Sequence, residues 1–247
     1  MIAQFHNLAV SAGRRARSAV WPTLAKRYRK DPSKASSLML KVLGIADISY
    51  RPNFAALANA VDNVPDPEGN VIECGVFRGS TLLGMAHRLA LRGMRRARLF
   101  GCDSFEGFPA PSQEDALSNG SFHEHARKGV YADTDFDRLR WQIASLGFNP
   151  TIQLMRGYFE DTLPQLAGLR FSIAHLDCDL YQSYVTCLDF VYPRLVQGGY
   201  MVFDEYAAAA PVYPGAQKAI DRFFADKPEK LQSYGEGPHA RHFIVKI

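Results

Sequence analysis

Acidic side chains follow two neighbouring apolar segments of the chain, and they are the residues best suited to chemistry. Asp177 and Asp179 come directly after one segment, and Asp204 and Glu205 come directly after the next. Adjacent strands of a sheet lie about 5 Å apart, so two parallel strands would bring these carboxylates together. Carboxylates at that distance repel one another unless a cation or a proton lies between them. The spacing therefore predicts a site that holds a cation or a proton.

The ligand types favour Mg²⁺ over zinc, because oxygen-only ligands suit a hard cation. The four cysteines form no CxxC pair and have no histidine at zinc spacing, so we interpret them as small apolar residues in a reducing compartment. These cysteines are Cys74, Cys102, Cys178 and Cys187. The alternative is that one or two of the acids only cap helices or pair with Arg156 or Arg194.

A second candidate ligand site lies at the turn Glu73–Ser80, where an apolar segment leads into a helical stretch. Glycines let a ligand approach the backbone there, and a helix N-terminus offers free N–H donors. The spacing is ExGxxxGS, which does not match the dinucleotide fingerprint GxGxxG. Asp103 ends the next apolar segment, about 30 residues on, where an acid accepts hydrogen bonds from ribose hydroxyls. Its alternative role is to cap the following turn.

Strand-like and helix-like segments alternate from residue 70 onward, which predicts an α/β fold with a mostly parallel sheet covered on both faces. Ligands bind such sheets beyond the carboxyl ends of the strands. Two final strands with no helix between them predict an antiparallel pair at one edge. The expected strands are 71–76, 98–103, 151–155, 171–176, 200–203, 231–234 and 242–247. We expect residues 1–69 to form a helical arm and cap and 70–247 the main domain, with a lid insertion at about 106–134.

The composition is that of an ordinary globular protein, with 247 residues, 47% hydrophobic and 22% charged. No apolar run approaches the roughly 18 residues of a membrane-spanning helix, so we expect none, and we expect a cytoplasmic location. The net charge is +4. Residues 1–41 carry nine Lys or Arg and one acid, a charge of +8 that leaves −4 for the remainder. A mildly acidic body with one basic arm argues against nucleic acid as a partner.

We do not expect the basic arm to be a secretory signal, because no continuous apolar stretch follows its first charges. We favour a helical arm that packs on the body or on a second subunit, and we expect a homo-oligomer formed through it. The alternatives are loose contact with an anionic membrane surface and an organelle transit peptide.

Four segments resemble the macrocin O-methyltransferase (TylF-type) family of class I S-adenosylmethionine-dependent enzymes. The resemblance implies a Rossmann-like class I methyltransferase fold with a seven-stranded sheet, and it implies S-adenosylmethionine and Mg²⁺ as cofactors. It also implies methylation of a hydroxyl on a small-molecule acceptor, typically a sugar of a glycosylated natural product. The segments are 73–80 (ECGVFRGS), 103–109 (DSFEGFP), 156–164 (RGYFEDTLP) and 176–205 (LDCDLYQSYVTCLDFVYPRLVQGGYMVFDE).

Matching positions carry the family's site residues onto this chain. Asp177, Asp204 and Glu205 would bind the metal, and Asp179 would be the general base. Glu205 departs from the pattern, because relatives usually have a second Asp; a longer side chain could reach the ion or displace it. The implied cofactor contacts are Glu73, Cys74, Gly75, Val76, Phe77, Asp103, Ser104, Phe105, Glu106, Gly107, Asp133, Tyr158, Phe159 and Asp177.

The same chemistry suits the residues without the family. A sugar hydroxyl is a poor nucleophile near neutral pH, so it needs a base, a Lewis acid or both. His123 and His125 lie in the expected lid, where we favour ordinary loop histidines over a catalytic role. Aromatic side chains are candidates for the acceptor pocket, because rings pack well on sugar faces. These candidates are Tyr50, Phe54, Tyr181, Tyr184, Tyr206 and Tyr213.

Three alternative functions remain at this level. A phenol or catechol acceptor would use the same metal arrangement. A nicotinamide-dependent oxidoreductase shares the glycine turn and the strand-end acid, but it has no need of four acids. A non-catalytic protein that kept the cofactor fold is disfavoured, because Asp177 and Asp179 are both present.

Overall fold

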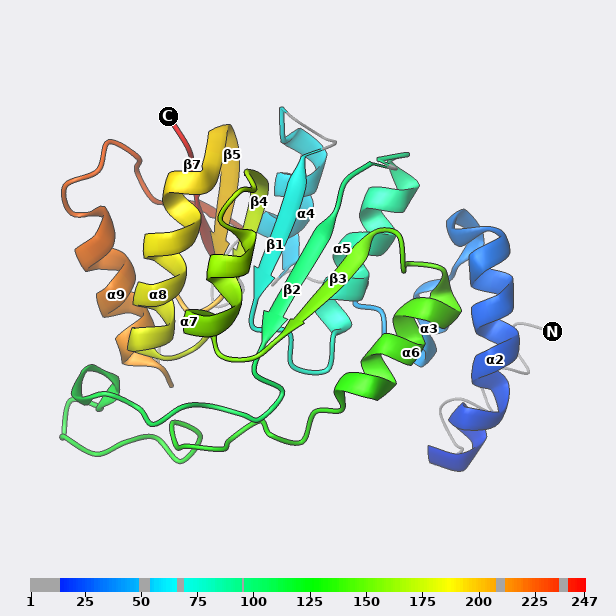
Figure 1. Ribbon diagram of the computed structural model, residues 1–247, viewed down its shortest axis with the longest axis horizontal. Coiled ribbons are helices and arrows are strands. Elements are labelled where there is room, and N and C mark those ends of the chain that lie inside the picture. The colour runs from blue at the N-terminus through cyan, green and yellow to red at the C-terminus, as the bar shows by residue number, and fades with distance from the viewer. Residues whose placement is uncertain (1–13, 49–53, 66–68, 95, 208–211, 236–239) are drawn as a thin grey trace.

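The predicted alternation of strands and helices forms a seven-stranded sheet in the computed structural model (Figure 1), which describes residues 14–48, 54–65, 69–94, 96–207, 212–235 and 240–247. The strand order is β3-β2-β1-β4-β5-β7-β6. The first five strands pair in parallel, and β7 is antiparallel to both of its neighbours. The antiparallel pairing of the last two strands, β6 and β7, was predicted. The strands are β1 (Asn70–Cys74), β2 (Leu99–Asp103), β3 (Ile152–Arg156), β4 (Phe171–Leu176), β5 (Leu195–Phe203), β6 (Gln232–Tyr234) and β7 (Arg241–Val245).

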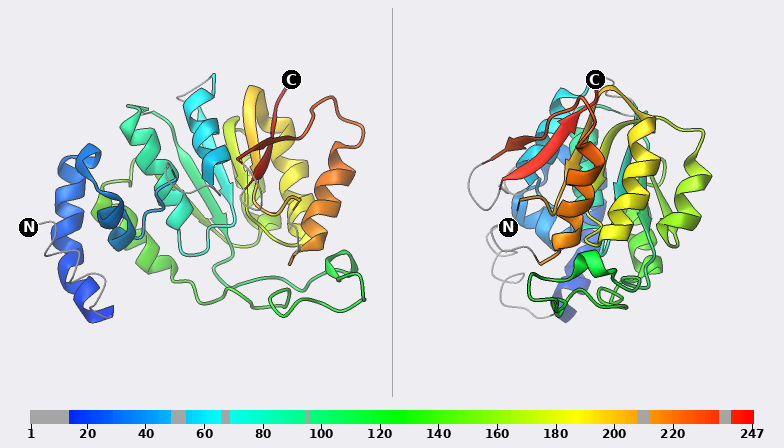
Figure 2. Two further views of the ribbon diagram at one scale, coloured as in Figure 1. Left: turned by 180° about the vertical axis from the view of Figure 1, so that it is seen from behind. Right: turned by 90° about the vertical axis from the view of Figure 1, so that its left-hand side faces the viewer.

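Helices cover both faces of this sheet because alternate strand residues on each face are apolar. Val71 and Leu99 point into the core beneath α4 and α5, whereas Ile72 and Phe100 point into the core beneath α8 and α9. Figures 1 and 2 show these two helical layers from opposite sides. The helices are α2 (Arg14–Lys30), α3 (Ser37–Leu43), α4 (Ala55–Asn63), α5 (Ser80–Leu91), α6 (Phe136–Leu146), α7 (Phe159–Thr162), α8 (Tyr181–Val191) and α9 (Pro214–Phe224), with 3₁₀ turns η1 (Pro32–Lys34), η3 (Gln113–Asp115), η4 (Leu163–Leu166) and η5 (Tyr192–Arg194).

The basic helix α2 packs on the body of its own chain. The Trp21 ring lies 4.5 Å from that of Trp141 on α6, and the buried Tyr28 hydroxyl lies 2.8 Å from Nδ1 of His87 on α5. The buried residues of α3 and α4 belong to the same core as Val71 of β1 and Leu99 of β2. Packing on the body was the first of the arm's expected roles. The first 13 residues lie outside the described ones, and the domain boundary near residue 69 remains a prediction.

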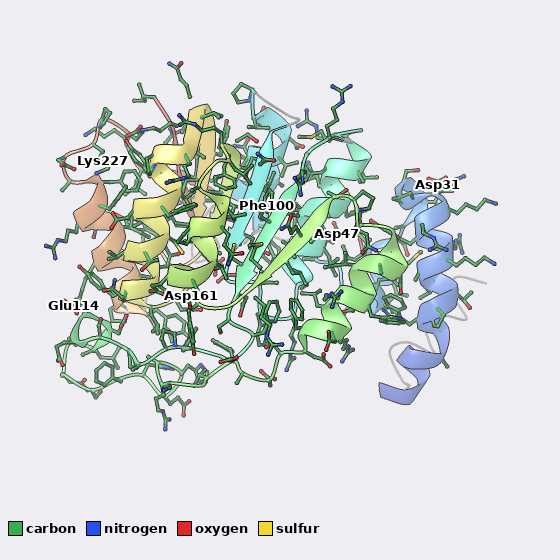
Figure 3. All side chains as sticks on the ribbon, in the orientation of Figure 1. Asp31, Asp47, Phe100, Glu114, Asp161 and Lys227 are labelled. Carbon is green, nitrogen blue, oxygen red and sulfur yellow. The ribbon has the colours of Figure 1, made fainter. Side chains whose placement is uncertain are left out.

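The insertion after β2 forms a long loop that runs beneath the carboxyl ends of the strands toward α9 (Figure 1). Its base is closed by two backbone hydrogen bonds, from Phe108 N to Val130 O and from Gly129 N to Phe108 O. The only regular structure in its described residues is the short turn η3. Glu114, labelled in Figure 3, marks where the loop meets α9, because Lys218 Nζ donates to its carbonyl oxygen over 2.5 Å. We call residues 106–134 the lid, as in the sequence analysis.

Within the ranges given above, no helix is both long enough and apolar enough to cross a membrane.

Candidate active site

A pocket of about 680 Å³ opens beyond the carboxyl ends of the five parallel strands, β1 to β5. Its volume falls in the usual range for small-molecule sites, about 300 to 1,000 Å³. The walls come from the turns after these strands, from the lid, from the segment before α9 and from the start of β7. This is the edge at which the sequence predicts a ligand.

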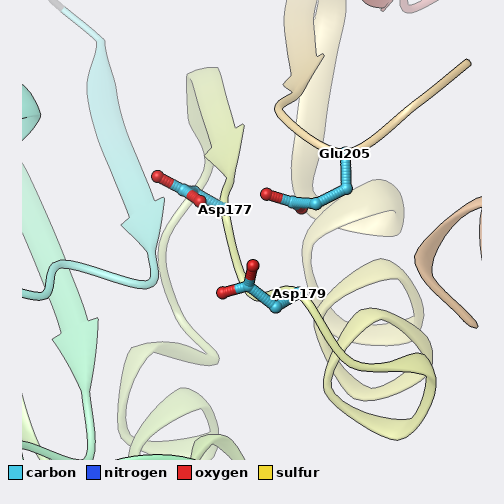
Figure 4. Close-up of side chains that lie close together, drawn as sticks. All are labelled: Asp177, Asp179 and Glu205. Carbon is cyan, nitrogen blue, oxygen red and sulfur yellow. The ribbon is translucent and has the colours of Figure 1, made fainter. Parts of the chain in front are cut away.

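Three carboxylates share the centre of the pocket: Asp177, Asp179 and Glu205 each offer an oxygen within 4.8 Å of the others. Figure 4 shows the three side chains gathered beyond the end of β4. Burial, followed by repulsion from neighbouring acids, raises the pKa of each of these carboxyls. Removing carboxylates from water and placing them side by side favours the neutral form or a bound cation. The group therefore has the properties of a cation or proton site.

Local backbone geometry brings the three acids together. Leu176 pairs with Phe203 across β4 and β5, so the acids that follow both strands leave the sheet side by side. Asp179 has a φ of 61°, a left-handed conformation that turns the chain back on itself after Asp177. Gly75 sits against this turn, because a Cβ added there would lie 1.6 Å from the carbonyl oxygen of Asp177. Only glycine allows that contact.

Asp204 lies outside this group of three. Its Oδ1 accepts a hydrogen bond from Nε of Arg241 on β7 over 3.0 Å, and both residues line the pocket. The resemblance assigns Asp204 to the metal and Asp179 to proton transfer. In this conformation Asp179 joins the cluster and Asp204 is paired with an arginine instead. Arg241 was not foreseen, because nothing in the sequence shows that β7, which pairs with both β5 and β6, begins at the pocket.

Asp103 organises the turns on the other side of the pocket. Its Oδ2 accepts from the backbone N–H groups of Val76 and Phe77, both at 2.8 Å, and its Oδ1 accepts from Phe105 N at 2.7 Å. The expected turn-capping role of Asp103 is therefore present. Asp103 also lines the pocket, and a carboxylate has about four acceptor positions, so one remains for a ligand.

The predicted cofactor residues divide into those that line the pocket and those that do not. The lining ones are Gly75, Phe77, Asp103, Ser104, Gly107, Tyr158, Phe159 and Asp177. Four others are buried behind the wall: Glu73, Cys74, Val76 and Phe105. Glu106 and Asp133 are exposed, and Asp133 forms an ion pair with Arg78.

Glu73 forms a buried pair that the sequence analysis missed. Its Oε1 lies 3.0 Å from Nδ1 of His175, its register partner on β4, and its Oε2 has no hydrogen-bond partner. Burial lowers the pKa of His175, but the hydrogen bond to Glu73 and the nearby acids raise it to about 8. The sequence spacing could have indicated His175, because it precedes Asp177 by two residues and residues two apart along a strand share a face.

Aromatic side chains from the lid and from the turns around it form part of the pocket wall. Tyr131 of the lid packs edge-on against Phe77 and Phe108, and its hydroxyl lies 3.0 Å from that of Tyr213. Of the expected acceptor-pocket aromatics, Tyr206 and Tyr213 line the pocket. Tyr181 and Tyr184 are buried in the core, Phe54 packs on the α4 side, and Tyr50 lies outside the described residues. The lid histidines do not line it.

Comparison with known families identifies this arrangement. The family model described as Macrocin-O-methyltransferase (TylF) matches residues 50–230, which include the three acids and the turn after β1. The chain belongs to this family. The expected resemblance is thereby confirmed, and so is the class I methyltransferase fold, which the sheet order and the solved relatives share.

Proteins with assigned activities match part of this chain. This chain is 32% identical to 8-demethyl-8-(2,3-dimethoxy-alpha-L-rhamnosyl)-tetracenomycin-C 4'-O-methyltransferase of Streptomyces olivaceus over 150 residues. The matched residues make up 60% of this chain and 56% of that protein. It is 28% identical to mycinamicin III 3''-O-methyltransferase of Micromonospora griseorubida over 151 residues. These residues make up 60% of this chain and 58% of that protein. The chain thus matches less than two thirds of the length of these relatives.

Solved structures share the fold over most of the chain. The O-methyltransferase NovP superposes with a TM-score of 0.65 at 21% identity, covering 86% of this chain and 99% of that one. The calicheamicin methyltransferase CalS11 superposes with a TM-score of 0.62 at 20% identity. The superposition covers 92% of this chain and 91% of CalS11.

Proposed function

We propose that this protein is an S-adenosylmethionine-dependent O-methyltransferase, assisted by Mg²⁺, that methylates a sugar hydroxyl of a glycosylated natural product. The observation that carries the proposal is the cluster of Asp177, Asp179 and Glu205 inside a ligand-sized pocket of a chain from this family. A nicotinamide-dependent oxidoreductase is set aside, because the family is one of methyltransferases.

The pocket wall formed by the turns after β1, β2 and β3 fits the cofactor. Asp103 keeps an acceptor position for ribose hydroxyls, and Tyr158 and Phe159 offer aromatic surface for an adenine ring. Gly75 leaves the backbone open where a Cβ would collide with Asp177. When bound, S-adenosylmethionine supplies an activated methyl group on a positively charged sulfur.

The carboxylate cluster fits a hard divalent cation, because its three oxygens lie within 4.8 Å of one another and carboxylate oxygens are the ligands that such a cation prefers. We assign Asp177 and Glu205 to the cation, because Asp204 lies outside the cluster and its Oδ1 accepts from Arg241. When bound, Mg²⁺ supplies a positive charge that stabilises a developing alkoxide.

Asp179 is the residue that accepts the proton of the acceptor hydroxyl. Its carboxylate lines the pocket beside Asp177, and burial raises its pKa, which makes it a stronger base than an exposed aspartate. The aromatic wall of Phe108, Tyr131 and Tyr213 excludes water from one side and offers ring faces to a sugar.

The acceptor class is supported by the relative from Streptomyces olivaceus, whose name gives 4'-O-methylation of a rhamnosyl tetracenomycin. A phenol or catechol acceptor is the second candidate, because the same cluster would serve it. A panel of glycosylated and phenolic acceptors, assayed with labelled S-adenosylmethionine with and without Mg²⁺, separates them. Methylation of phenols alone would overturn the sugar assignment.

Calorimetric titration with S-adenosylmethionine is the first test of the proposal as a whole. We expect micromolar binding to the folded protein. Absence of binding, with folding verified by circular dichroism, would refute the methyltransferase assignment and leave the acids to another ligand.

A further inference from the structure

Tyr184 lies behind the carboxylate cluster and contacts two parts of it. This residue of α8 is fully buried, with its ring in the core on the α8 face. Its hydroxyl lies 2.5 Å from Oε2 of Glu205 and 2.8 Å from the carbonyl oxygen of Leu176, the residue before Asp177. One phenol therefore connects the glutamate that follows β5 to the backbone that leads into Asp177.

Glu205 is the member of the cluster that most needs such a contact. It has one more rotatable bond than Asp177 or Asp179, and fixing a longer side chain costs more conformational entropy. Because one carboxylate oxygen is held by a buried, rigid phenol, the second oxygen remains available at a defined position. Partners of this kind, one step removed from a metal, orient the ligands that do bind it.

We propose that Tyr184 is a positioning residue for the divalent cation: its hydroxyl holds Glu205 so that the carboxylate reaches the same ion as Asp177. The inference rests on the metal site of the proposed function. It adds a residue of the core, which does not line the pocket, to the set that determines cation affinity.

Tyr184→Phe tests the inference, because it removes only the hydroxyl. The probe is Mn²⁺, whose free concentration is followed by electron paramagnetic resonance during titration of the full chain. We expect the Kd for Mn²⁺ to rise at least about tenfold, the usual effect of removing such a partner. The Kd for S-adenosylhomocysteine should stay unchanged, because Tyr184 lies outside the cofactor wall.

Tyr192→Phe is the matched control. It removes a tyrosine hydroxyl that donates to Glu229 Oε2 over 2.7 Å, a part-buried bond whose residues do not line the pocket. We expect its Mn²⁺ affinity to equal that of the wild type. Equal weakening in both phenylalanine variants would show a general loss of stability and overturn the inference.

Glu205→Asp supplies the decisive comparison, because the shorter side chain no longer reaches Tyr184 from the same backbone position. Tyr184→Phe should weaken Mn²⁺ binding in the wild-type background and have no further effect in Glu205→Asp. An undiminished effect in both backgrounds would mean that Tyr184 acts through Leu176, which contradicts the inference.

The failures of the two proposals are distinguishable. Unchanged Mn²⁺ affinity in Tyr184→Phe, with tight binding to the wild type, would refute the role of Tyr184 alone. A wild type that binds S-adenosylmethionine but no Mn²⁺ would remove the metal site and this inference together, and would leave methyl transfer standing.

Discussion

At the scale of single residues, the pocket is lined by side chains whose backbone is strained. Phe77, Tyr131, Asp179 and Ala207 have φ values of 48°, 63°, 61° and 57°, and all four line the pocket. A non-glycine residue in this region costs about 1–3 kcal/mol and persists only where its surroundings hold it. The conformation of Asp179 is thus stabilised by the rest of the fold, which places its carboxylate next to Asp177.

Asp179→Asn should abolish most turnover while leaving the cofactor site intact. The amide keeps the shape of the side chain but accepts no proton, and a positioned general base contributes about 10²- to 10⁴-fold to rate. We expect kcat to fall by that factor and the Kd for S-adenosylmethionine to change little, measured by steady-state kinetics and calorimetry. Near wild-type kcat would exclude Asp179 as the base.

At the scale of elements, the lid is attached to the helix that follows the acids. Asp115 is fully buried in the lid turn η3; its Oδ1 accepts from Tyr181 N, in the first turn of α8, over 2.7 Å. Its Oδ2 accepts from the backbone N–H and the hydroxyl of Ser112. A carboxylate at a helix N-terminus also interacts favourably with the helix dipole. Asp115 therefore fixes the lid close to the turn that carries Asp179.

Asp115→Ala should loosen the lid without unfolding the sheet. We expect faster trypsin cleavage after Arg127 or Lys128 of the lid and a higher KM for the acceptor, because the aromatic wall is no longer held in place. Limited proteolysis followed by mass spectrometry measures the first effect. Asp137→Ala, an exposed acid of α6, is the control; equal cleavage in both variants would show that Asp115 does not hold the lid.

The contact between α2 and α5 makes stability depend on pH. Burial lowers the pKa of His87, which stays neutral beside the Tyr28 hydroxyl. The unfolded chain protonates this histidine below a pH of about 6.5, while the folded chain resists protonation. Its contribution to stability is therefore present above that pH and is lost as the pH falls through it.

His87→Gln should reduce this pH dependence. We expect the free energy of unfolding, from urea titrations at pH 7.5 and pH 5.5, to fall more on acidification in the wild type than in the variant. Tyr28→Phe keeps the buried histidine and should keep the wild-type difference. Identical pH dependence in the wild type and His87→Gln would contradict the assignment.

At the scale of the whole molecule, the acids of the site are an electrostatic cost that a bound cation relieves. A ligand at about 100 times its Kd stabilises the folded state by about 2.7 kcal/mol, and each kcal/mol raises Tm by about 2–4 °C for a chain of this size. We therefore expect saturating Mn²⁺ to raise the Tm of the wild type by several degrees in a calorimetric scan. Asp177→Asn should lose this increase, and Asp204→Asn should keep most of it because Asp204 is paired with Arg241. If both variants lost the Mn²⁺-induced rise in Tm equally, Asp204 would be a metal ligand, which contradicts this assignment.

The sequence by itself determined the sheet, its antiparallel closing pair and the edge at which the acids gather. Those features depend on local patterns: apolar segments of strand length, helices that begin and end at capping residues such as Asp135 and Gly147, and acids placed directly after strands. The lid insertion was also visible, as a long polar stretch between two elements.

Only the tertiary structure decided which acids meet. Asp204 and Glu205 are neighbours in sequence, yet one pairs with Arg241 from β7 and the other with Tyr184 from α8. His175 and Arg241 entered the description for the same reason, since their partners are 102 and 37 residues away. Such partnerships depend on side-chain direction and on the packing of distant strands, which spacing along the chain does not encode.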